Sequence, residues 1–369
     1  MTTIRLPGLI DPHVHLRDPG ATHKEDFDTG TAAALAGGFT CVLDMPNNTP
    51  PITDAATLAT KQAAARVKAR CDYGLHLGAG EDNVETAAAL SPQVTGLKMY
   101  LDQTFGPLRL DDLPALMRHA ERWPHDRPLL CHAEGSFAIA AAIMAAHVSG
   151  APVHICHVSR EEEIDLIRRA KDKGIHVTCE ATPHHLFLTE GDAATIGAGR
   201  SDVRPRLARE GDRAALRAHL DVIDCFATDH APHTRAEKDS PAAPPGFPGL
   251  ETALALYLEL VRQGLMSIEG LIDRTVNNPR RIFGLPDQPD TWIEVDPDEE
   301  WVARGPELFT RARWTPFEGW LLRGRVRRVV LRGAEVYDNG RVLAAPGFGR
   351  DVRAQSHCLS EQVERSISA

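Results

Sequence analysis

Two histidines end the first short apolar run of the chain, and a single residue separates them. His13 and His15 lie in the run Gly8–Leu16. Side chains alternate along a β-strand with a period of two, so both imidazoles are expected on the same side. Directed inward they would supply two ligands of a metal site, whereas on a solvated face they would be surface histidines. Asp11 and Arg17 extend the same row.

Three more polar residues follow short apolar runs, namely His132, His157 and Asp229. Taken singly, each would more often be a hydrogen-bonded histidine or a capping carboxylate than a ligand. Together with the first pair they provide four imidazoles and a carboxylate, the ligands that suit zinc and related metals and leave room for a bound water. This combination predicts a metal centre.

A lysine ends another such run, Lys98 in Gly96-Leu97-Lys98-Met99-Tyr100. Burial among metal ligands would favour its neutral amine. A neutral amine can react with carbon dioxide to give a carbamate, an anion able to bridge two metal ions. A lysine that turns outward to pair with a helix carboxylate is the alternative.

These residues need a scaffold that brings the ends of separate strands together. Short runs rich in Val, Ile, Leu and Cys alternate with helical stretches, which is typical of a parallel sheet. Right-handed strand, helix, strand units repeated about eight times predict an α/β fold, a (β/α)8 TIM barrel with its active site at the carboxyl ends of the strands. An open doubly wound sheet is the alternative, but no Gly-x-Gly-x-x-Gly turn supports it. The predicted strands are Gly8–Leu16, Thr40–Met45, Asp72–Leu77, Gly96–Leu101, Pro128–His132, Val153–His157, His176–Glu180 and Asp224–Asp229, and the predicted helices include Thr29–Ala36, Ala55–Lys68, Asp111–Glu121, Ser136–His147, Glu161–Ala170, Asp212–Leu220, Leu250–Arg262 and Ile268–Val276.

The composition changes after the last predicted helix. From Trp292 to Gly347 the chain carries β-type runs such as Val326–Leu331 and turn signals such as Asn339-Gly340. We expect residues 8–285 to form the catalytic barrel, and residues 1–7 with 286–350 to form a small β annex. Residues 351–369 are polar and unpatterned, which is typical of a tail or linker.

Composition limits the possible partners. The 369 residues carry a formal charge of −10 and no Lys/Arg block, which argues against nucleic acid and favours a small-molecule substrate. No apolar run approaches the roughly 18 residues of a membrane span, and no secretion signal is present. The seven dispersed cysteines are typical of reduced, buried thiols, so we expect a cytoplasmic protein.

Several longer motifs resemble those of dihydroorotases in the amidohydrolase superfamily, and most closely the dihydroorotase domain of the multifunctional CAD protein of pyrimidine biosynthesis. The similarity runs from about Ile4 to Arg353. The motifs are His13-Val14-His15-Leu16-Arg17-Asp18-Pro19-Gly20, Met45-Pro46-Asn47, Gly96-Leu97-Lys98-Met99-Tyr100, Cys131-His132-Ala133-Glu134, His154-Ile155-Cys156-His157, Thr182-Pro183-His184-His185-Leu186 and Thr228-Asp229-His230-Ala231-Pro232-His233.

This resemblance implies a ligand set. His13, His15 and Asp229 would hold one zinc ion, His132 and His157 a second, and a carboxylated Lys98 would bridge the two. In the CAD-like branch, Cys156 and Glu180 resemble ligands of a third zinc near His13. A cysteine on a buried strand is more usually just a small apolar side chain.

The implied activity is the reversible cyclisation of N-carbamoyl-L-aspartate to L-dihydroorotate, with a metal-bridging hydroxide and Asp229 as general acid and base. The substrate carboxylate would be held by Arg17, Asn47 and His233, and further substrate contacts would come from Arg204 and from the main chain of the Pro245-Gly246 loop. Thr104 and Phe105 would form a mobile lid.

Two other functions stay open at this point. Dihydropyrimidinases, hydantoinases and allantoinases share the fold and metals, but dihydropyrimidine and hydantoin substrates lack the carboxylate that Arg17 would bind. A catalytically inactive scaffold is the other alternative, although every expected ligand is present. The family also implies a homodimer, either free-standing or as part of a larger multifunctional chain with carbamoyl phosphate synthetase and aspartate transcarbamoylase.

Overall fold

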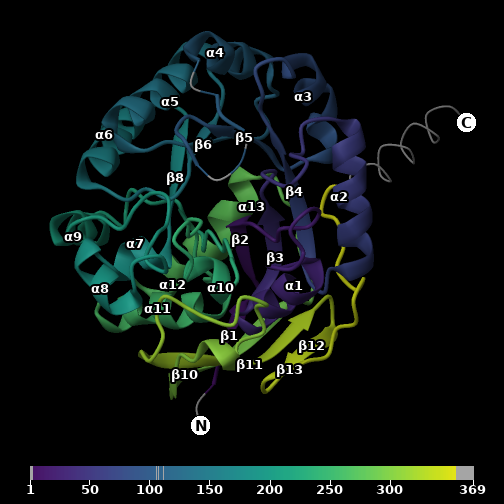
Figure 1. Ribbon diagram of the computed structural model, residues 1–369, viewed down its shortest axis with the longest axis vertical. Helices are drawn as coiled ribbons and strands as arrows, with labels where there is room; N and C mark the ends of the chain where they lie inside the picture. Colours follow the sequence, from purple (N-terminus) through teal and green to yellow (C-terminus); the bar gives the residue numbers. More distant parts are fainter. Residues whose placement is uncertain (1–2, 105, 107, 111, 355–369) are drawn as a thin grey trace, which may run out of the picture.

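The computed structural model describes residues 3–104, 106, 108–110 and 112–354. Its centre is a parallel sheet whose eight strands follow one another in sequence order, so each strand pairs with the next one along the chain. Figure 1 shows these strands surrounded by helices, which confirms the predicted TIM barrel. The strands are β2 Leu9–Val14, β3 Phe39–Asp44, β4 Asp72–Gly78, β5 Gly96–Tyr100, β6 Leu129–His132, β7 Val153–Ile155, β8 Val177–Ala181 and β9 Cys225–Phe226.

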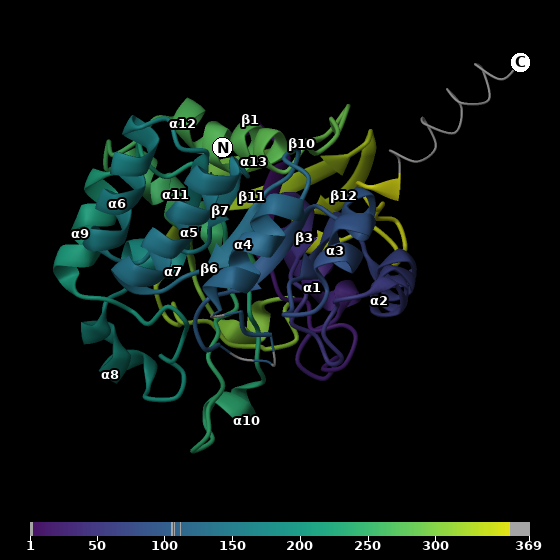
Figure 2. The same cartoon turned by 90° about the horizontal axis from the view of Figure 1, so that it is seen from above.

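The barrel strands are buried on both faces, as expected where helices cover a parallel sheet. Each predicted helix is present, either with the predicted ends or with ends that differ by a few residues. The shorter helices α3, α7, α8, α10 and α13 were not predicted. Figure 2 shows α8 and α10 extending from one end of the barrel. The helices are α1 Phe27–Ala36, α2 Ala55–Lys68, α3 Val84–Leu90, α4 Leu113–Arg122, α5 Gly135–Ser149, α6 Glu161–Asp172, α7 Pro183–Phe187, α8 Ala193–Ile196, α9 Glu210–Ala218, α10 Arg235–Lys238, α11 Leu250–Arg262, α12 Ile268–Ile272 and α13 Asn278–Ile282.

The barrel closes between its first and last strands through a few specific contacts. The Asp11 carboxylate on β2 accepts hydrogen bonds from the main-chain N–H of Thr228, at 3.1 Å, and from its hydroxyl, at 2.5 Å. Further along the two segments, Val14 forms a β-bridge with His230, and the N–H of His15 donates to the His230 carbonyl at 2.8 Å. These contacts place the end of β2 beside the segment that follows β9.

A second, antiparallel sheet lies beside the barrel, at the lower edge of Figure 1. It consists of β1 Ile4–Pro7, β10 Trp292–Val302, β11 Leu321–Leu331, β12 Ala334–Asp338 and β13 Arg341–Val342, in that order. The N-terminus therefore contributes one strand to a sheet that is otherwise C-terminal. The first residues of the predicted tail pack onto the barrel instead of leaving it, because Asp351 bridges Tyr73 and the N–H of Val352 donates to the Tyr73 carbonyl at 2.9 Å. The division at residues 8–285 and 286–350 stays a proposal.

Two expectations from composition concern the cysteines and membrane-spanning helices. Cys41, Cys71, Cys131, Cys156, Cys179 and Cys225 are buried free thiols, and Cys358 lies outside the described residues. Among the helices that the structure describes, none has both the length and the apolar composition needed to cross a bilayer.

A buried lysine holds the loop that follows β3. Lys61 on α2 has no exposed surface, and its amine lies 2.7 Å from Oδ2 of Asp44. The same amine donates to the Met45 carbonyl at 2.6 Å and to Oδ1 of Asn48 at 2.8 Å. The other oxygen of Asp44 accepts the N–H of Leu16 at 2.7 Å. This pair therefore joins the β3 loop to the segment after β2.

Replacing Lys61 by methionine should lower the free energy of unfolding by about 3–5 kcal/mol, because it leaves the buried Asp44 carboxylate without its partner. Equilibrium denaturation in urea measures the loss. Lys68, on the same helix, is the matched control: its amine also lies 2.7 Å from a carboxylate, Asp18, but the side chain is 35% exposed. Lys68→Met should cost about 1 kcal/mol or less. Equal losses in the two variants would contradict the structural role given to Lys61.

Candidate metal centre and substrate pocket

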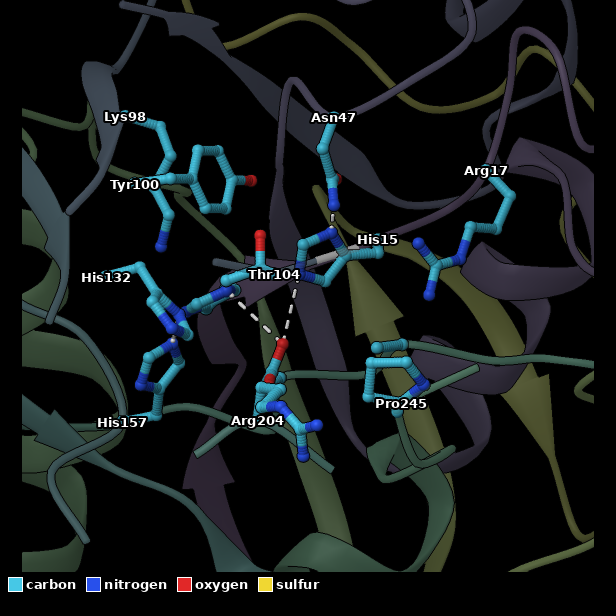
Figure 3. Close-up of a pocket in the computed structure, with 14 residues that line it drawn as sticks. His15, Arg17, Asn47, Lys98, Tyr100, Thr104, His132, His157, Arg204 and Pro245 are labelled. Atoms are coloured by element: carbon cyan, nitrogen blue, oxygen red, sulfur yellow. Dashed lines mark hydrogen bonds and ion pairs between the residues drawn. The ribbon is translucent and has the colours of Figure 1, made fainter. Parts of the chain in front are cut away.

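The predicted site residues gather around one pocket at the carboxyl ends of the barrel strands. Figure 3 shows Lys98, His132 and His157 on one side of this pocket and Arg17 on the other. Cys156, Glu180 and His233 do not line it but contact residues that do, and Phe105 lies outside the described residues. The lining residues are His13, His15, Arg17, Asn47, Lys98, Tyr100, Thr104, His132, His157, Arg204, Asp229, Ala231, Pro245 and Gly246.

His13, His15 and Asp229 converge, as their places at the two ends of the closed sheet require. The Nε2 atoms of His13 and His15 lie 3.3 Å and 3.0 Å from Oδ1 of Asp229. Nδ1 of His13 is 2.5 Å from Oε1 of Glu180, and Nδ1 of His15 is 2.6 Å from Oδ1 of Asn47. These oxygens accept, so each Nδ1 carries the ring proton and each Nε2 faces Asp229.

The charge states agree with this geometry. Burial lowers the pKa of His15 to about 3, although Asp229 opposes the shift. Burial alone would raise the pKa of Asp229, but His13 and His15 outweigh it and hold that pKa well below its usual range. The two Nε2 atoms and the ionised carboxylate therefore bring three potential ligand atoms together in one place. The three side chains fit a metal ion.

His132 and His157 form the opposite wall. Nδ1 of His132 lies 2.8 Å from Nε2 of His157, and Nε2 of His132 lies 3.1 Å from Oε1 of Glu134. Burial lowers the pKa of both rings, although the hydrogen bond to Glu134 opposes the shift at His132, so both are neutral at pH 7. Nδ1 of His157 is buried and has no hydrogen-bond partner among the described residues. Neutral, buried imidazoles with lone pairs to offer are suitable metal ligands.

Cys156 and Glu180 lie behind residues that line the pocket, and Lys98 contacts the first of them. The Lys98 amine donates to Sγ of Cys156 at 2.9 Å, so the lysine points into the barrel and the outward alternative is wrong. Burial holds the pKa of the Cys156 thiol well above its usual range. Glu180 lies between two histidines, with Oε1 against His13 and Oε2 3.1 Å from Nε2 of His154. Cys156, Glu180 and His13 are close enough to share a metal ion.

The Arg17 end of the pocket offers hydrogen-bond donors. Nε of Arg17 donates to the Pro232 carbonyl at 3.1 Å, and Nη2 lies 3.1 Å from Nε2 of His233. Burial lowers the pKa of Arg17 to about 10, so the guanidinium is still charged at neutral pH. Arg204 lines the same pocket and donates to Oδ1 of Asp202 at 2.7 Å. A buried guanidinium in such a place favours an anionic ligand.

Three site residues adopt a backbone conformation that non-glycine residues rarely take. The φ angles are 61° at Arg17, 37° at His157 and 46° at Asp229. Left-handed conformations of this kind cost about 1–3 kcal/mol each and occur preferentially at functional sites. Each of these residues follows a barrel strand, so the turn out of the sheet directs the side chain into the pocket.

Sequence reasoning missed several partners of the predicted residues. Tyr100 lines the pocket and Glu134 contacts His132, and both could have been found because each lies two residues after a predicted ligand. His154, which contacts Glu180, lies two residues before the predicted ligand Cys156 and could have been found in the same way. Lys24, which contacts His233 at 3.0 Å, comes from a loop with no strand pattern.

The chain is similar to known proteins over most of its length. The amidohydrolase family model matches residues 4–288. The multifunctional protein CAD of Squalus acanthias is 54% identical over 351 residues, and this chain spans 16% of that relative's length while 95% of the chain is covered. The dihydroorotase of Pyrococcus abyssi is 38% identical, with 95% of this chain and 87% of the relative covered.

Among solved structures, the L-hydantoinase (dihydropyrimidinase) of Arthrobacter aurescens has a TM-score of 0.90 at 23% identity, covering 95% of this chain and 89% of that one. That likeness shows the shared fold. Because the family model covers most of the chain and the dihydroorotase of Pyrococcus abyssi matches over nearly its full length, this chain belongs to the amidohydrolase family and, within it, is related to the dihydroorotases.

Proposed function

We propose that this chain is a dihydroorotase, which catalyses the reversible cyclisation of N-carbamoyl-L-aspartate to L-dihydroorotate in de novo pyrimidine biosynthesis. The observation that carries the proposal is the division of the pocket. Imidazoles and the Asp229 carboxylate, which are suited to metal ions, line one part of the pocket, and the buried Arg17 guanidinium lies on the other side. A substrate with a cyclic amide at one end and a carboxylate at the other matches both sides.

For the metal side, we propose the ligand set that the sequence implies. His13, His15 and Asp229 would hold one zinc ion and His132 and His157 a second, with a carboxylated Lys98 between them. Cys156 and Glu180 are proposed ligands of a third ion near His13. The convergence of the His13 and His15 Nε2 atoms on Asp229 supports this assignment, as does Nδ1 of His157, which has no hydrogen-bond partner among the described residues.

When bound, a pair of zinc ions would lower the pKa of a water and polarise the amide carbonyl. The protein supplies the proton transfer. Asp229, ionised in the free protein, would take the proton from the attacking water and return it to the ring nitrogen as the carbon–nitrogen bond breaks. Ring closure follows the same steps in reverse.

For the carboxylate side, we propose that Arg17, Asn47 and His233 bind the substrate, with Arg204 and the Pro245 carbonyl as further contacts. Arg17 and a carboxylate can form two parallel charge-assisted hydrogen bonds, which fix the ring in one orientation. Thr104 lines the pocket and is the described part of the proposed lid. We also propose a cytoplasmic location, and carbamoyl phosphate synthetase and aspartate transcarbamoylase as neighbours within a larger chain.

The zinc-loaded protein should contain about two or more metal ions per chain and should turn over both carbamoyl aspartate and dihydroorotate. Dihydrouracil, hydantoin and allantoin should react with at least about 100-fold lower kcat/KM, because they leave Arg17 without a carboxylate partner. Elemental analysis and parallel kinetic assays measure both quantities.

His15→Ala should lower the metal content, whereas His219→Ala, which changes a histidine bonded to Arg168 instead, should leave it unchanged. Fewer than two metal ions per chain, with no turnover of either dihydroorotase substrate, would reject the proposal. Preferential turnover of hydantoin or dihydrouracil would assign the chain to the alternative cyclic amidases.

Asp229→Asn should lower kcat by about 10²–10⁴-fold, because an amide cannot accept and return the proton. Substrate binding, measured by calorimetry on the metal-loaded variant, should change little. Asp221→Asn is the control, since that carboxylate forms an exposed ion pair with Arg168. A kcat near the wild-type value in Asp229→Asn would remove the residue from the mechanism.

We further propose a homodimer that forms through α5. The exposed face of this helix carries Phe137, Met144 and Val148, and Phe137 is 93% exposed. The helix contains no Asp, Glu, Lys or Arg, so burying it against a second copy would desolvate no formal charge.

Phe137→Glu should dissociate the dimer at micromolar concentration, as measured by sedimentation velocity. Leu321→Glu, which changes an exposed leucine on β11, should not. A wild-type protein that sediments as a monomer would contradict the dimer, and dissociation by Leu321→Glu alone would move the interface to the annex.

A further inference from the structure

A lysine outside the predicted site lies behind the Arg17 end of the pocket. Lys24 belongs to the loop between β2 and α1 and is 7% exposed. Its amine lies 3.0 Å from Nδ1 of His233 and 3.2 Å from Oε1 of Glu237. Neither the metal chemistry nor the proton transfer uses this lysine, so its contact with a proposed substrate-binding histidine needs its own explanation.

The lysine decides which ring nitrogen of His233 carries the proton. An ammonium group can donate hydrogen bonds but cannot accept one, so Nδ1 of His233 must be the acceptor. The proton of the neutral ring is then on Nε2. The Pro245 carbonyl, 3.0 Å from Nε2, can only accept and agrees with this tautomer. Burial, and then the charges of Arg17, Lys24 and Lys238, lower the pKa of His233, so the ring is neutral.

This tautomer places two donors side by side. Nη2 of Arg17 lies 3.1 Å from Nε2 of His233, and each of these nitrogens carries a proton. In this structure the Nε2 proton is donated to the Pro245 carbonyl. A carboxylate oxygen placed between the two nitrogens would accept from both, because its negative charge makes it the stronger acceptor. With the opposite tautomer, Nε2 would accept from Arg17 and offer nothing to the anion.

Hydrogen bonds from neighbouring segments fix the positions of Lys24 and His233. The N–H of Ala21 donates to the Arg17 carbonyl, and the N–H of Lys24 donates to the Ala21 carbonyl, both at 2.9 Å. Arg17 and Lys24 therefore lie on one compact, hydrogen-bonded segment. The C-terminal sheet region fixes the histidine, because Nε1 of Trp314 donates to the His233 carbonyl at 2.8 Å.

We propose that Lys24 is a positioning residue for carboxylate recognition: its ammonium group donates to Nδ1 of His233 and so keeps on Nε2 the proton that the ring donates, beside Arg17, to the substrate carboxylate. This inference rests on the proposed dihydroorotase function for the identity of the anion. The tautomer itself does not depend on that function.

The test compares wild type with Lys24→Met, which keeps a long side chain and removes the donor. Nitrogen NMR of histidine-labelled protein, with the His233 signals identified by their loss in His233→Ala, should show a proton on Nε2 in wild type and no such preference in Lys24→Met. The KM for carbamoyl aspartate should rise about tenfold or more while kcat changes little. Lys171→Met, which changes a lysine paired with Asp224 next to β9, should leave the tautomer and KM unchanged.

A double-mutant cycle separates positioning from a general structural role. If Lys24 acts through His233, Lys24→Met should add nothing to the KM of His233→Ala. A proton on Nδ1 in wild type, an unchanged tautomer in Lys24→Met, or full additivity of the two KM changes would overturn the inference. A wild-type protein with the Nε2 proton but no turnover of carbamoyl aspartate or dihydroorotate would instead contradict the proposed function.

Discussion

Closure of the barrel between β2 and β9 is the constraint on which the site depends. His13 and His15 lie near the N-terminus and Asp229 lies more than two hundred residues later, yet each imidazole lies within 3.3 Å of the Asp229 carboxylate. The Asp11 carboxylate brings these segments together by accepting both donors of Thr228. Burial raises the pKa of Asp11 to about 7 despite those hydrogen bonds, so the closure itself costs desolvation energy.

The pocket then has to accommodate a dense group of polar side chains away from water. The imidazoles of His15, His132 and His157 do so by staying neutral, because burial lowers their pKa values. Asp229 and Glu180 stay ionised because each has two histidines against it. Neutral imidazoles that offer lone pairs and negatively charged carboxylates therefore lie close together, and this combination attracts metal cations.

The antiparallel sheet and its loops also support the substrate side of the pocket. The Glu25 carboxylate accepts hydrogen bonds from the Thr310 hydroxyl and the Arg311 N–H, which holds the loop that carries Lys24. Trp314 holds the main chain of His233 in the same way. Residues that appeared from their sequence to belong to a separate annex thus fix the position of two side chains at the Arg17 end.

The sequence by itself determined the barrel and the type of chemistry at its mouth. Period-two alternation in His13-Val14-His15 and the polar residues at strand ends carry that information locally, and the exact helix ends were less certain because capping residues shift them by a few positions. Only the tertiary structure decided which nitrogen of each imidazole faces which oxygen, that Glu180 lies between His13 and His154, and that Lys24 reaches His233. Those pairings join segments of the chain that are far apart in sequence, and no local pattern records the side-chain geometry that arises when the barrel closes.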